Sequence, residues 1–358
     1  MPKLARLATR IGLIKVGALG DVVRTTAILP GLKRLFPDME LTWITSPAAF
    51  PLIEGNPYVA RVVAFNGSPD EPWRHCDYDW VISLDDEERL CDLAASLKSR
   101  RLSGAYRNGS GCTYTVDLAP WFGMGLMRPA GQGGLERANE LKRSNCKTYG
   151  EILYRCLGLS KPIARPFIRV PAEKRRRAAE WVRSNQFLGP LVGLNTGAGS
   201  RWRFKSWGED QTVELAQALV DSLNASVIIL GGAAETERNR RIAAAVNRPQ
   251  VCAAPTDLDL ISFAAFIDQV DVLVTSDSLG LHFGTALEKA IVAFFGPTSS
   301  AEIDLYDLGE KITTPLRCHT CYLKECDISP NCMESIPVQR LLEVTAAQLS
   351  ANRHSACA

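Results

Sequence analysis

The chain has 358 residues, of which 46% are hydrophobic and 22% are charged, and its formal net charge is +2 at pH 7. The length predicts two domains, and the composition excludes a disordered chain. The small net charge gives no global attraction to nucleic acid, because the basic residues occur only in short local clusters. No segment approaches the ~20 apolar residues that a membrane span needs.

The N-terminal sequence and the cysteine count predict a cytoplasmic protein. Residues 1–21 begin basic and become apolar, but Lys15 interrupts the apolar run and Asp21 follows it, which is a poor match to a signal peptide. The eleven cysteines are an odd number, which argues against a disulfide framework, and we expect mostly reduced thiols. Any membrane association would be peripheral.

In the first half of the chain, short runs rich in Val and Ile predict buried parallel strands. A helical period predicts a helix over 22–36, with Pro30 as a point where it can kink. The predicted strands are 11–16, 40–45, 61–65 and 79–84.

Residues 161–172 carry three prolines and no helical period, so we predict an extended linker there. The second half alternates more plainly, with strands 191–195, 226–230, 271–275 and 290–295 and helices 209–223, 234–247, 259–268 and 281–289. This alternation predicts two doubly wound α/β domains of the Rossmann type. Their predicted bounds are 1–165 and 173–340, followed by a C-terminal helix and tail at 341–358.

The loop after the first predicted strand reads GALG over 17–20 and ends on Asp21. Glycines allow the backbone to approach a ligand, and the helix that follows favours an anion. The loop nevertheless lacks the third glycine of GxGxxG and the Lys-Ser/Thr of a P-loop, and Asp21 would repel a phosphate. Asp21 is therefore either an N-cap, which is the more frequent role, or a general base for a substrate hydroxyl.

The strand-end loops of the second half predict a nucleotide-diphosphate site, because ligands of such sheets lie beyond the carboxyl ends of the strands. Lys205 would neutralise the diphosphate, and Glu235 would accept bonds from a ribose or base. Backbone N–H groups near Ser278 would bind phosphate. The other predicted binding residues are Asn195, Thr196, Gly197, Gly231, Asp277, Gly280 and His282.

Four segments together resemble glycosyltransferase family 9, the ADP-heptose:lipopolysaccharide heptosyltransferases. They are IKVGALGDVVRTTAILPGLKRLFPDMELTWIT, NTGAGSRWRFKSW, LGGAAETE and SDSLGLHFGTALEKAIVAFFGPTS, and they occur in the family's order over nearly the whole chain. The resemblance implies a GT-B fold, in which two Rossmann-like domains face an interdomain cleft. The first domain would bind the acceptor and the second the nucleotide-sugar.

The resemblance also implies inverting transfer without a catalytic metal, from ADP-heptose to an anionic glycolipid, the lipopolysaccharide core, at the cytoplasmic face of the inner membrane. Asp21 matches the family's general base, and Lys15 matches a basic residue that holds the acceptor or the transition state. The turn containing Gly20 would approach the sugar end of the donor. Thr196, Lys205, Asp277 and His282 match donor-binding positions, and Glu235 matches a ribose or base contact.

One motif departs from the family. The family commonly reads Asp-Thr-Gly before the histidine, whereas Asp277-Ser278-Leu279-Gly280 shifts the glycine by one position and keeps the spacing from Asp277 to His282. This departure affects the expected phosphate turn more than the site as a whole.

Four cysteines, Cys318, Cys321, Cys326 and Cys332, lie within fifteen residues. A CxxC pair followed by two further thiols is compatible with a tetrahedral zinc or iron site. Free thiols or a reversible disulfide explain the segment about equally well. Resemblance to protein-glycosylating relatives with a four-cysteine iron site favours the metal slightly, and such a metal would be structural.

Two alternatives to a lipopolysaccharide acceptor remain open. The acceptor could be a protein Ser/Thr side chain or a small glycoside, which the four-cysteine segment favours. A nucleotide-sensing or scaffold protein without activity is disfavoured, because Asp21, Lys205, Asp277 and His282 are all present.

Overall fold

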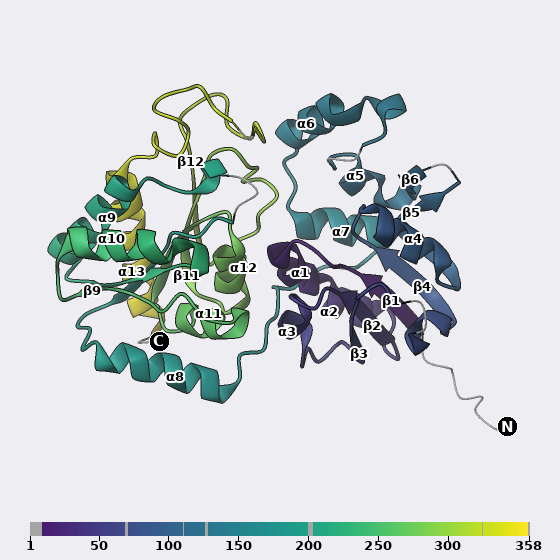
Figure 1. Cartoon of the computed structure of the whole chain (residues 1–358), viewed down its shortest axis with the longest axis horizontal. Helices are drawn as coiled ribbons and strands as arrows, with labels where there is room; N and C mark the ends of the chain where they lie inside the picture. The colour runs from purple at the N-terminus through teal and green to yellow at the C-terminus, as the bar shows by residue number, and fades with distance from the viewer. Residues whose placement is uncertain are drawn as a thin grey trace. The chain divides into compact units, whose positions relative to one another are not determined.

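The computed structural model describes residues 9–68, 71–109, 111–125, 128–199, 203–323 and 325–356. The chain forms two compact units, residues 1–169 and 170–358, and each contains one six-stranded sheet (Figure 1). The division lies inside the proline-containing segment for which an extended linker is predicted. The α/β class predicted from the alternation of strands and helices is confirmed.

The first unit has the strand order β3-β2-β1-β4-β5-β6, in which all neighbours are parallel except the antiparallel pair β5 and β6. The central strands are buried on both faces, which explains their continuous apolar runs. The strands are β1 (Arg10–Ile14), β2 (Glu40–Thr45), β3 (Arg61–Ala64), β4 (Tyr78–Ser83), β5 (Ser99–Asn108) and β6 (Gly111–Tyr114).

The helix predicted over 22–36 is divided in the structure. It consists of α1 (Leu19–Thr25), a 3-10 turn (Thr26–Ile28) and α2 (Leu29–Leu35). The Thr26 hydroxyl donates to the Val23 carbonyl at 2.6 Å, and this local bond competes with the regular helical ladder. Pro30 lies in the first turn of α2, where its missing N–H is not needed. The unit's other helices are α3 (Phe50–Ile53), α4 (Glu88–Ser96), α5 (Ala119–Phe122), α6 (Gly134–Ser144) and α7 (Tyr149–Leu157).

The second unit has an all-parallel sheet with the order β12-β11-β10-β7-β8-β9. Its strands are β7 (Leu191–Asn195), β8 (Ser226–Leu230), β9 (Val251–Ala253), β10 (Val272–Ser276), β11 (Ala290–Phe295) and β12 (Gly309–Thr313). Its helices are α8 (Ala172–Ser184), α9 (Glu209–Leu223), α10 (Thr236–Val246), α11 (Leu260–Ile267), α12 (Leu279–Ala286) and α13 (Val338–Ala356).

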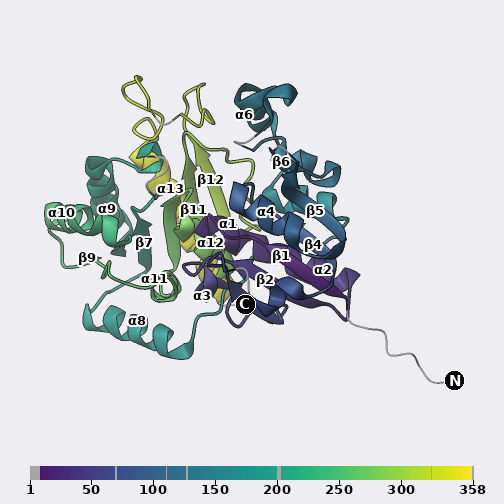
Figure 2. The same cartoon turned by 45° about the vertical axis from the view of Figure 1, so that its right-hand side comes forward.

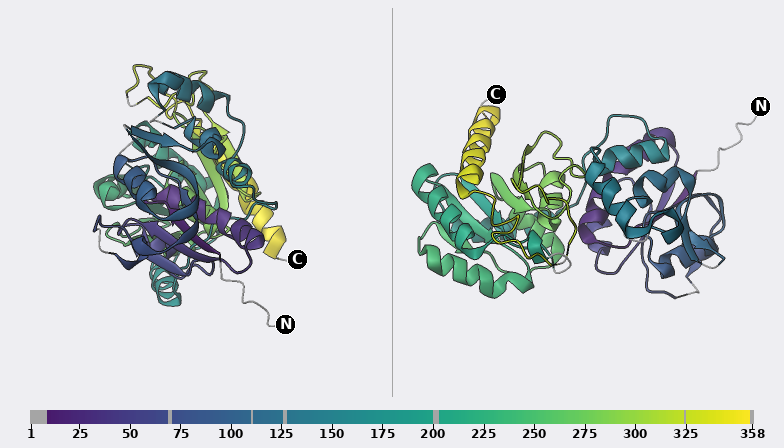
Figure 3. Two further views of the ribbon diagram at one scale, coloured as in Figure 1. Left: turned by 90° about the vertical axis from the view of Figure 1, so that its right-hand side faces the viewer. Right: turned by 90° about the horizontal axis from the view of Figure 1, so that it is seen from above.

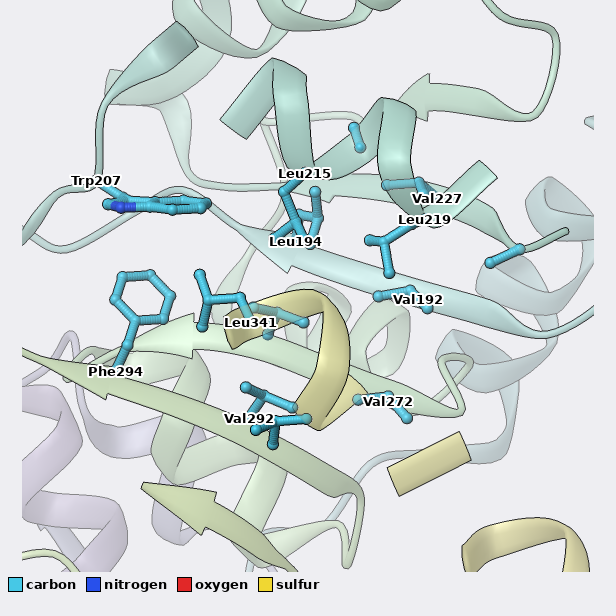
Figure 4. Packing of buried hydrophobic residues seen from close by; sticks show 14 of the residues in the cluster. Val192, Leu194, Trp207, Leu215, Leu219, Val227, Val272, Val292, Phe294 and Leu341 are labelled. Carbon is cyan, nitrogen blue, oxygen red and sulfur yellow. The ribbon is translucent and has the colours of Figure 1, made fainter. Parts of the chain in front are cut away.

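Strand β11 shows how helices cover both faces of this sheet. Val292 and Phe294 belong to the core cluster under α9 and α13, whereas the alternate residues Ile291 and Phe295 pack with Leu281 of α12. In the first cluster the Phe294 ring lies 5.6 Å from the Trp207 ring, centroid to centroid (Figure 4). The helix α13, drawn in yellow, contacts β10, β11 and α9 and is therefore part of the second unit (Figures 2 and 3).

Each sheet has a point where the strand order reverses. Asp21 follows β1, Asn195 ends β7 and Asp277 follows β10, which are strands at these points, whereas Glu235 follows the neighbouring strand β8. In the first unit this point lies between β1 and β4, and in the second it lies between β7 and β10. Ligands of doubly wound sheets bind beside such points, beyond the carboxyl ends of the strands. Within the described ranges, no helix has the length and apolar character that crossing a bilayer would require.

Candidate active site

In the second unit, Asp277 follows β10 and forms a shielded ion pair. Its Oδ2 lies 2.9 Å from the Lys205 Nζ and accepts a hydrogen bond from the Thr298 hydroxyl at 2.8 Å, and the Lys205 and Asp277 side chains are only 13% and 16% exposed. Burial alone would raise the pKa of Asp277, but the Lys205 ammonium and His282 lower it to about 2. Asp277 is therefore ionised at neutral pH and fixes Lys205 at the strand end.

Asn195 joins the ends of β7 and β10. Its Nδ2 donates to the hydroxyls of Thr275 and Ser278, both at 2.9 Å. A Cβ on Gly280 would lie 2.7 Å from this nitrogen, so the close approach requires glycine. Ser278 is the N-cap of α12 but makes no capping bond with its side chain, so its hydroxyl does not occupy the first-turn N–H groups.

The loops after β7 and β8 pack together around Thr196 and Glu235. The Thr196 Oγ1 lies 2.6 Å from the Asn239 Oδ1, and Glu235 accepts the Gly232 N–H at 2.9 Å. A Cβ on Gly197 would lie 3.3 Å from the Glu235 Oε2, and one on Gly231 would lie 2.8 Å from the Asn239 Nδ2. The predicted donor-binding residues of the second unit therefore lie on neighbouring loops at one edge of its sheet.

In the first unit, Asp85 follows β4 and binds the end of β1. One carboxylate oxygen pairs with the Lys15 ammonium, and the other accepts the N–H groups of Val16 and, at 3.4 Å, of Gly17. In nucleotide-binding sheets, N–H groups at this position receive a phosphate. Here the Asp85 carboxylate occupies the position that such a phosphate would take. This contact explains why the glycine turn resembles a phosphate loop without matching one.

Asp21 is the third residue of α1, and the N-cap is Ala18, so the interpretation of Asp21 as an N-cap is wrong. The Asp21 Oδ1 lies 2.9 Å from the Arg24 Nη2, and its Oδ2 lies 3.9 Å from the Lys15 Nζ. Burial would lower the pKa of Lys15, but Asp85 and Asp21 raise it above its ordinary value, so the lysine stays charged. The Asp21 side chain is 31% exposed, and it can therefore meet a substrate hydroxyl.

Sequence analysis did not find three residues that lie around Asp21 and Lys15, namely Asp85, Arg24 and Tyr149. Asp85 directly follows the predicted strand 79–84, so the rule that ligand-binding residues follow strands could have found it. Arg24 lies one helical turn after Asp21, on the same face of α1. Tyr149 comes from α7, and its hydroxyl lies 2.7 Å from the Thr25 Oγ1 across 124 positions, a contact without any local signal.

We expect Asp85→Asn to lower the free energy of unfolding by about 2 kcal/mol, because a hydrogen bond to a charged group contributes about that much. The variant leaves Lys15 without its shorter ion pair and weakens the bond to the Val16 N–H. Urea titration followed by tryptophan fluorescence would measure the change. The matched control is Asp77→Asn, which removes an exposed pair with Lys98 and should leave the midpoint unchanged. If Asp85→Asn and wild type have the same midpoint of urea unfolding, the contacts of Asp85 with the end of β1 do not stabilise the protein.

The four-cysteine segment does not support the predicted zinc or iron site. Among the described residues, which leave out position 324 of this segment, no group of three or more His, Cys, Asp or Glu could hold a metal ion. Cys332 belongs to the hydrophobic core of the second unit, whereas Cys318 is exposed and Cys321 and Cys326 are partly exposed. Burial and the neighbouring thiols of Cys321, Cys326 and Cys318 raise the pKa of Cys332 to about 11.

Comparison with known proteins connects this geometry to one family. The family model described as glycosyltransferase family 9 (heptosyltransferase) matches residues 137–330, more than half of the chain. Lipopolysaccharide heptosyltransferase 1 of Pseudomonas aeruginosa is 23% identical over 340 residues, covering 90% of this chain and 88% of that protein.

Solved structures show the same fold. A glycosyl transferase family 9 protein from Veillonella parvula has a TM-score of 0.72 at 19% identity, covering 97% of this chain and 99% of that chain. The ADP-heptose lipopolysaccharide heptosyltransferase II of Escherichia coli has a TM-score of 0.69 at 18% identity, covering 96% and 99%. The family match begins after Lys15 and Asp21, so their roles stay predictions. The chain belongs to glycosyltransferase family 9.

Proposed function

We propose that this glycosyltransferase moves a heptose from ADP-heptose to a hydroxyl group of a lipopolysaccharide core acceptor, with inversion and with Asp21 as general base. The observation that carries the proposal is the setting of Asp21, a partly exposed carboxylate beyond β1 with a cation near each oxygen. Similarity to lipopolysaccharide heptosyltransferases of Pseudomonas aeruginosa and Escherichia coli supports this choice of donor and acceptor.

In this proposal the second unit binds the donor diphosphate. An ammonium group has three N–H donors, so Lys205 can bond phosphate oxygens while it keeps its contact with Asp277. His282 and the first-turn N–H groups of α12 supply further positive charge. The Glu235 carboxylate uses one oxygen for the Gly232 N–H and has a second oxygen for a ribose hydroxyl. The loops around the donor are shaped by Asn195, Thr196, Gly197, Gly231, Ser278 and Gly280.

The proposed chemistry balances with one proton transfer. Asp21 accepts the proton of the acceptor hydroxyl as its oxygen bonds to the anomeric carbon, and the bond from that carbon to the diphosphate oxygen breaks. ADP leaves with the bonding electron pair, and Lys205 stabilises its added negative charge. Lys15 would hold an anionic group of the acceptor or of the transition state, and the turn at Gly20 would lie near the sugar.

A glycolipid acceptor places the reaction at the cytoplasmic face of the inner membrane, with peripheral contact only. Mass spectrometry of products made from ADP-heptose tests the proposal, with three acceptors in separate reactions: lipopolysaccharide core, a Ser/Thr peptide and a small glycoside. We expect one added heptose on the lipopolysaccharide core only.

Each other outcome has a definite meaning. Heptose on the peptide or the glycoside alone would overturn the acceptor. Transfer from another nucleotide-sugar but not from ADP-heptose would overturn the donor. If no acceptor is modified and calorimetry detects no ADP binding, the proposed function is wrong.

A further inference from the structure

Arg24 is enclosed by two aromatic rings. Its Cζ lies 4.0 Å from the centroid of the Tyr149 ring and 5.6 Å from that of Trp121 on α5, and the two rings meet edge to face at 4.8 Å. Tyr149 is held in turn by its hydroxyl bond to Thr25. Only 13% of the Arg24 side chain is exposed. Stacking against rings restricts the rotamers of an arginine, so its guanidinium has a fixed place.

This enclosure distinguishes the pair of Arg24 with Asp21 from ordinary surface pairs at the same spacing. Exposed pairs three residues apart contribute little, because two long side chains lose rotamer freedom to form them. Here the rings already hold the arginine, and its Nη2 lies 2.9 Å from the Asp21 Oδ1. Fixing Oδ1 also fixes the direction in which Oδ2 points.

We propose that Arg24 is a positioning residue for the transfer reaction. Tyr149 and Trp121 hold the guanidinium, and the guanidinium holds the Asp21 carboxylate in the orientation that receives the acceptor's proton. This inference rests on the proposed role of Asp21 as general base. Misplacing a catalytic group by about 1 Å can cost about 10²-fold in rate, so such a clamp has a measurable effect.

The charged and titratable groups that act on Asp21 or on the neighbouring Lys15 are Arg24 on α1, Asp85 after β4 and Tyr149 on α7. Asp86, also after β4, acts on Lys15 and Asp85. Replacing Arg24 leaves Lys15 in place but removes the nearer cation. The ionised carboxylate is then less favoured, so the acid limb of the kcat profile should move to higher pH.

Three variants test the proposal. Arg24→Met should lower kcat about 10- to 100-fold and move the acid limb to higher pH, while KM for the donor stays within about twofold. Arg24→Lys keeps the charge but loses the planar fork, so it should restore the acid limb and only part of kcat. Trp121→Leu keeps both charges and removes one ring, and it should lower kcat with little change in the acid limb.

The matched control is Arg240→Met on α10, which removes an exposed pair with Glu237 at the same spacing and should leave all parameters unchanged. Wild-type kcat and pH profile in folded Arg24→Met would overturn the proposal. If that variant does not fold, as judged by circular dichroism, wild-type kinetics in both Arg24→Lys and Trp121→Leu would overturn it instead.

The experiment also separates this proposal from the one on which it rests. Full activity of Asp21→Asn in the same assay would refute the general base, and with it the role of Arg24. An inactive Asp21→Asn beside a fully active Arg24→Met would refute the role of Arg24 alone.

Discussion

Asp21→Asn is expected to lower kcat by about 10²- to 10⁴-fold, the range that general base catalysis contributes, while the affinity for ADP stays unchanged. Asparagine keeps the size of the side chain and one hydrogen-bond acceptor near Arg24, but it cannot take up the proton of the acceptor hydroxyl. Product formation at saturating substrates measures the first effect, and calorimetry with ADP measures the second.

Asp38→Asn is a suitable control, because Asp38 is an exposed carboxylate between α2 and β2 of the same unit. It should leave kcat unchanged. A kcat within threefold of wild type for Asp21→Asn would exclude proton transfer to this residue. A large loss of ADP affinity would instead mean that Asp21 acts in donor binding.

Lys205→Met is expected to lower the free energy of unfolding by about 4 kcal/mol and to weaken ADP binding at least tenfold. The stability falls because Asp277 keeps a shielded charge without its ammonium partner, and breaking such a pair costs about 3–5 kcal/mol. Binding falls because the diphosphate loses charge-assisted hydrogen bonds. Urea titration and calorimetry measure the two effects on one preparation.

The double variant Lys205→Met/Asp277→Asn separates the two causes. Removing both charges should restore most of the stability lost in Lys205→Met, but it should not restore ADP affinity. If Lys205→Met is as stable as wild type, the ion pair does not stabilise the second unit. If the double variant binds ADP normally, Lys205 does not contact the diphosphate.

The pH dependence of stability gives a further readout of the same pair. The pKa of Asp277 falls from 3.8 to about 2 in the folded protein, so the unfolded chain binds the proton more readily. The carboxylate's contribution is therefore complete above about pH 4 and is lost as the pH falls toward 2. Wild type should lose more stability than Asp277→Asn over that interval.

The sequence predicts the central part of both sheets well, because buried parallel strands are short and continuously apolar. The strands at 40–45, 191–195 and 226–230 and the helix at 209–223 have the predicted bounds. The sequence does not predict four of the strands, β5, β6, β9 and β12. β5 reads SRRLSGAYRN and β12, at an edge, reads GEKIT, so neither carries an apolar run that distinguishes it from a loop.

The residues of the candidate site that follow predicted strands could be found from the sequence, whereas those placed by tertiary packing could not. Asn195, Lys205 and Asp277 could be predicted from their places after strands, and the structure brings them to one sheet edge. The four-cysteine spacing is compatible with a metal, with free thiols or with a disulfide, and spacing does not show that Cys332 packs into the core. The ring pair of Tyr149 and Trp121 around Arg24 depends on the packing of α5 and α7, which no local pattern encodes.

The carboxylate of Asp85 at the end of β1 makes the two sheets unequal as targets for inhibitors. The backbone N–H group of Val16 in the first unit is already bonded to the Asp85 carboxylate. A compound bearing a pyrophosphate would have to displace this carboxylate, and break its ion pair with Lys15, before it could bind there. Nucleotide mimics should therefore be designed for the second unit alone. Ligands for the first unit should present neutral hydroxyl groups to Asp21.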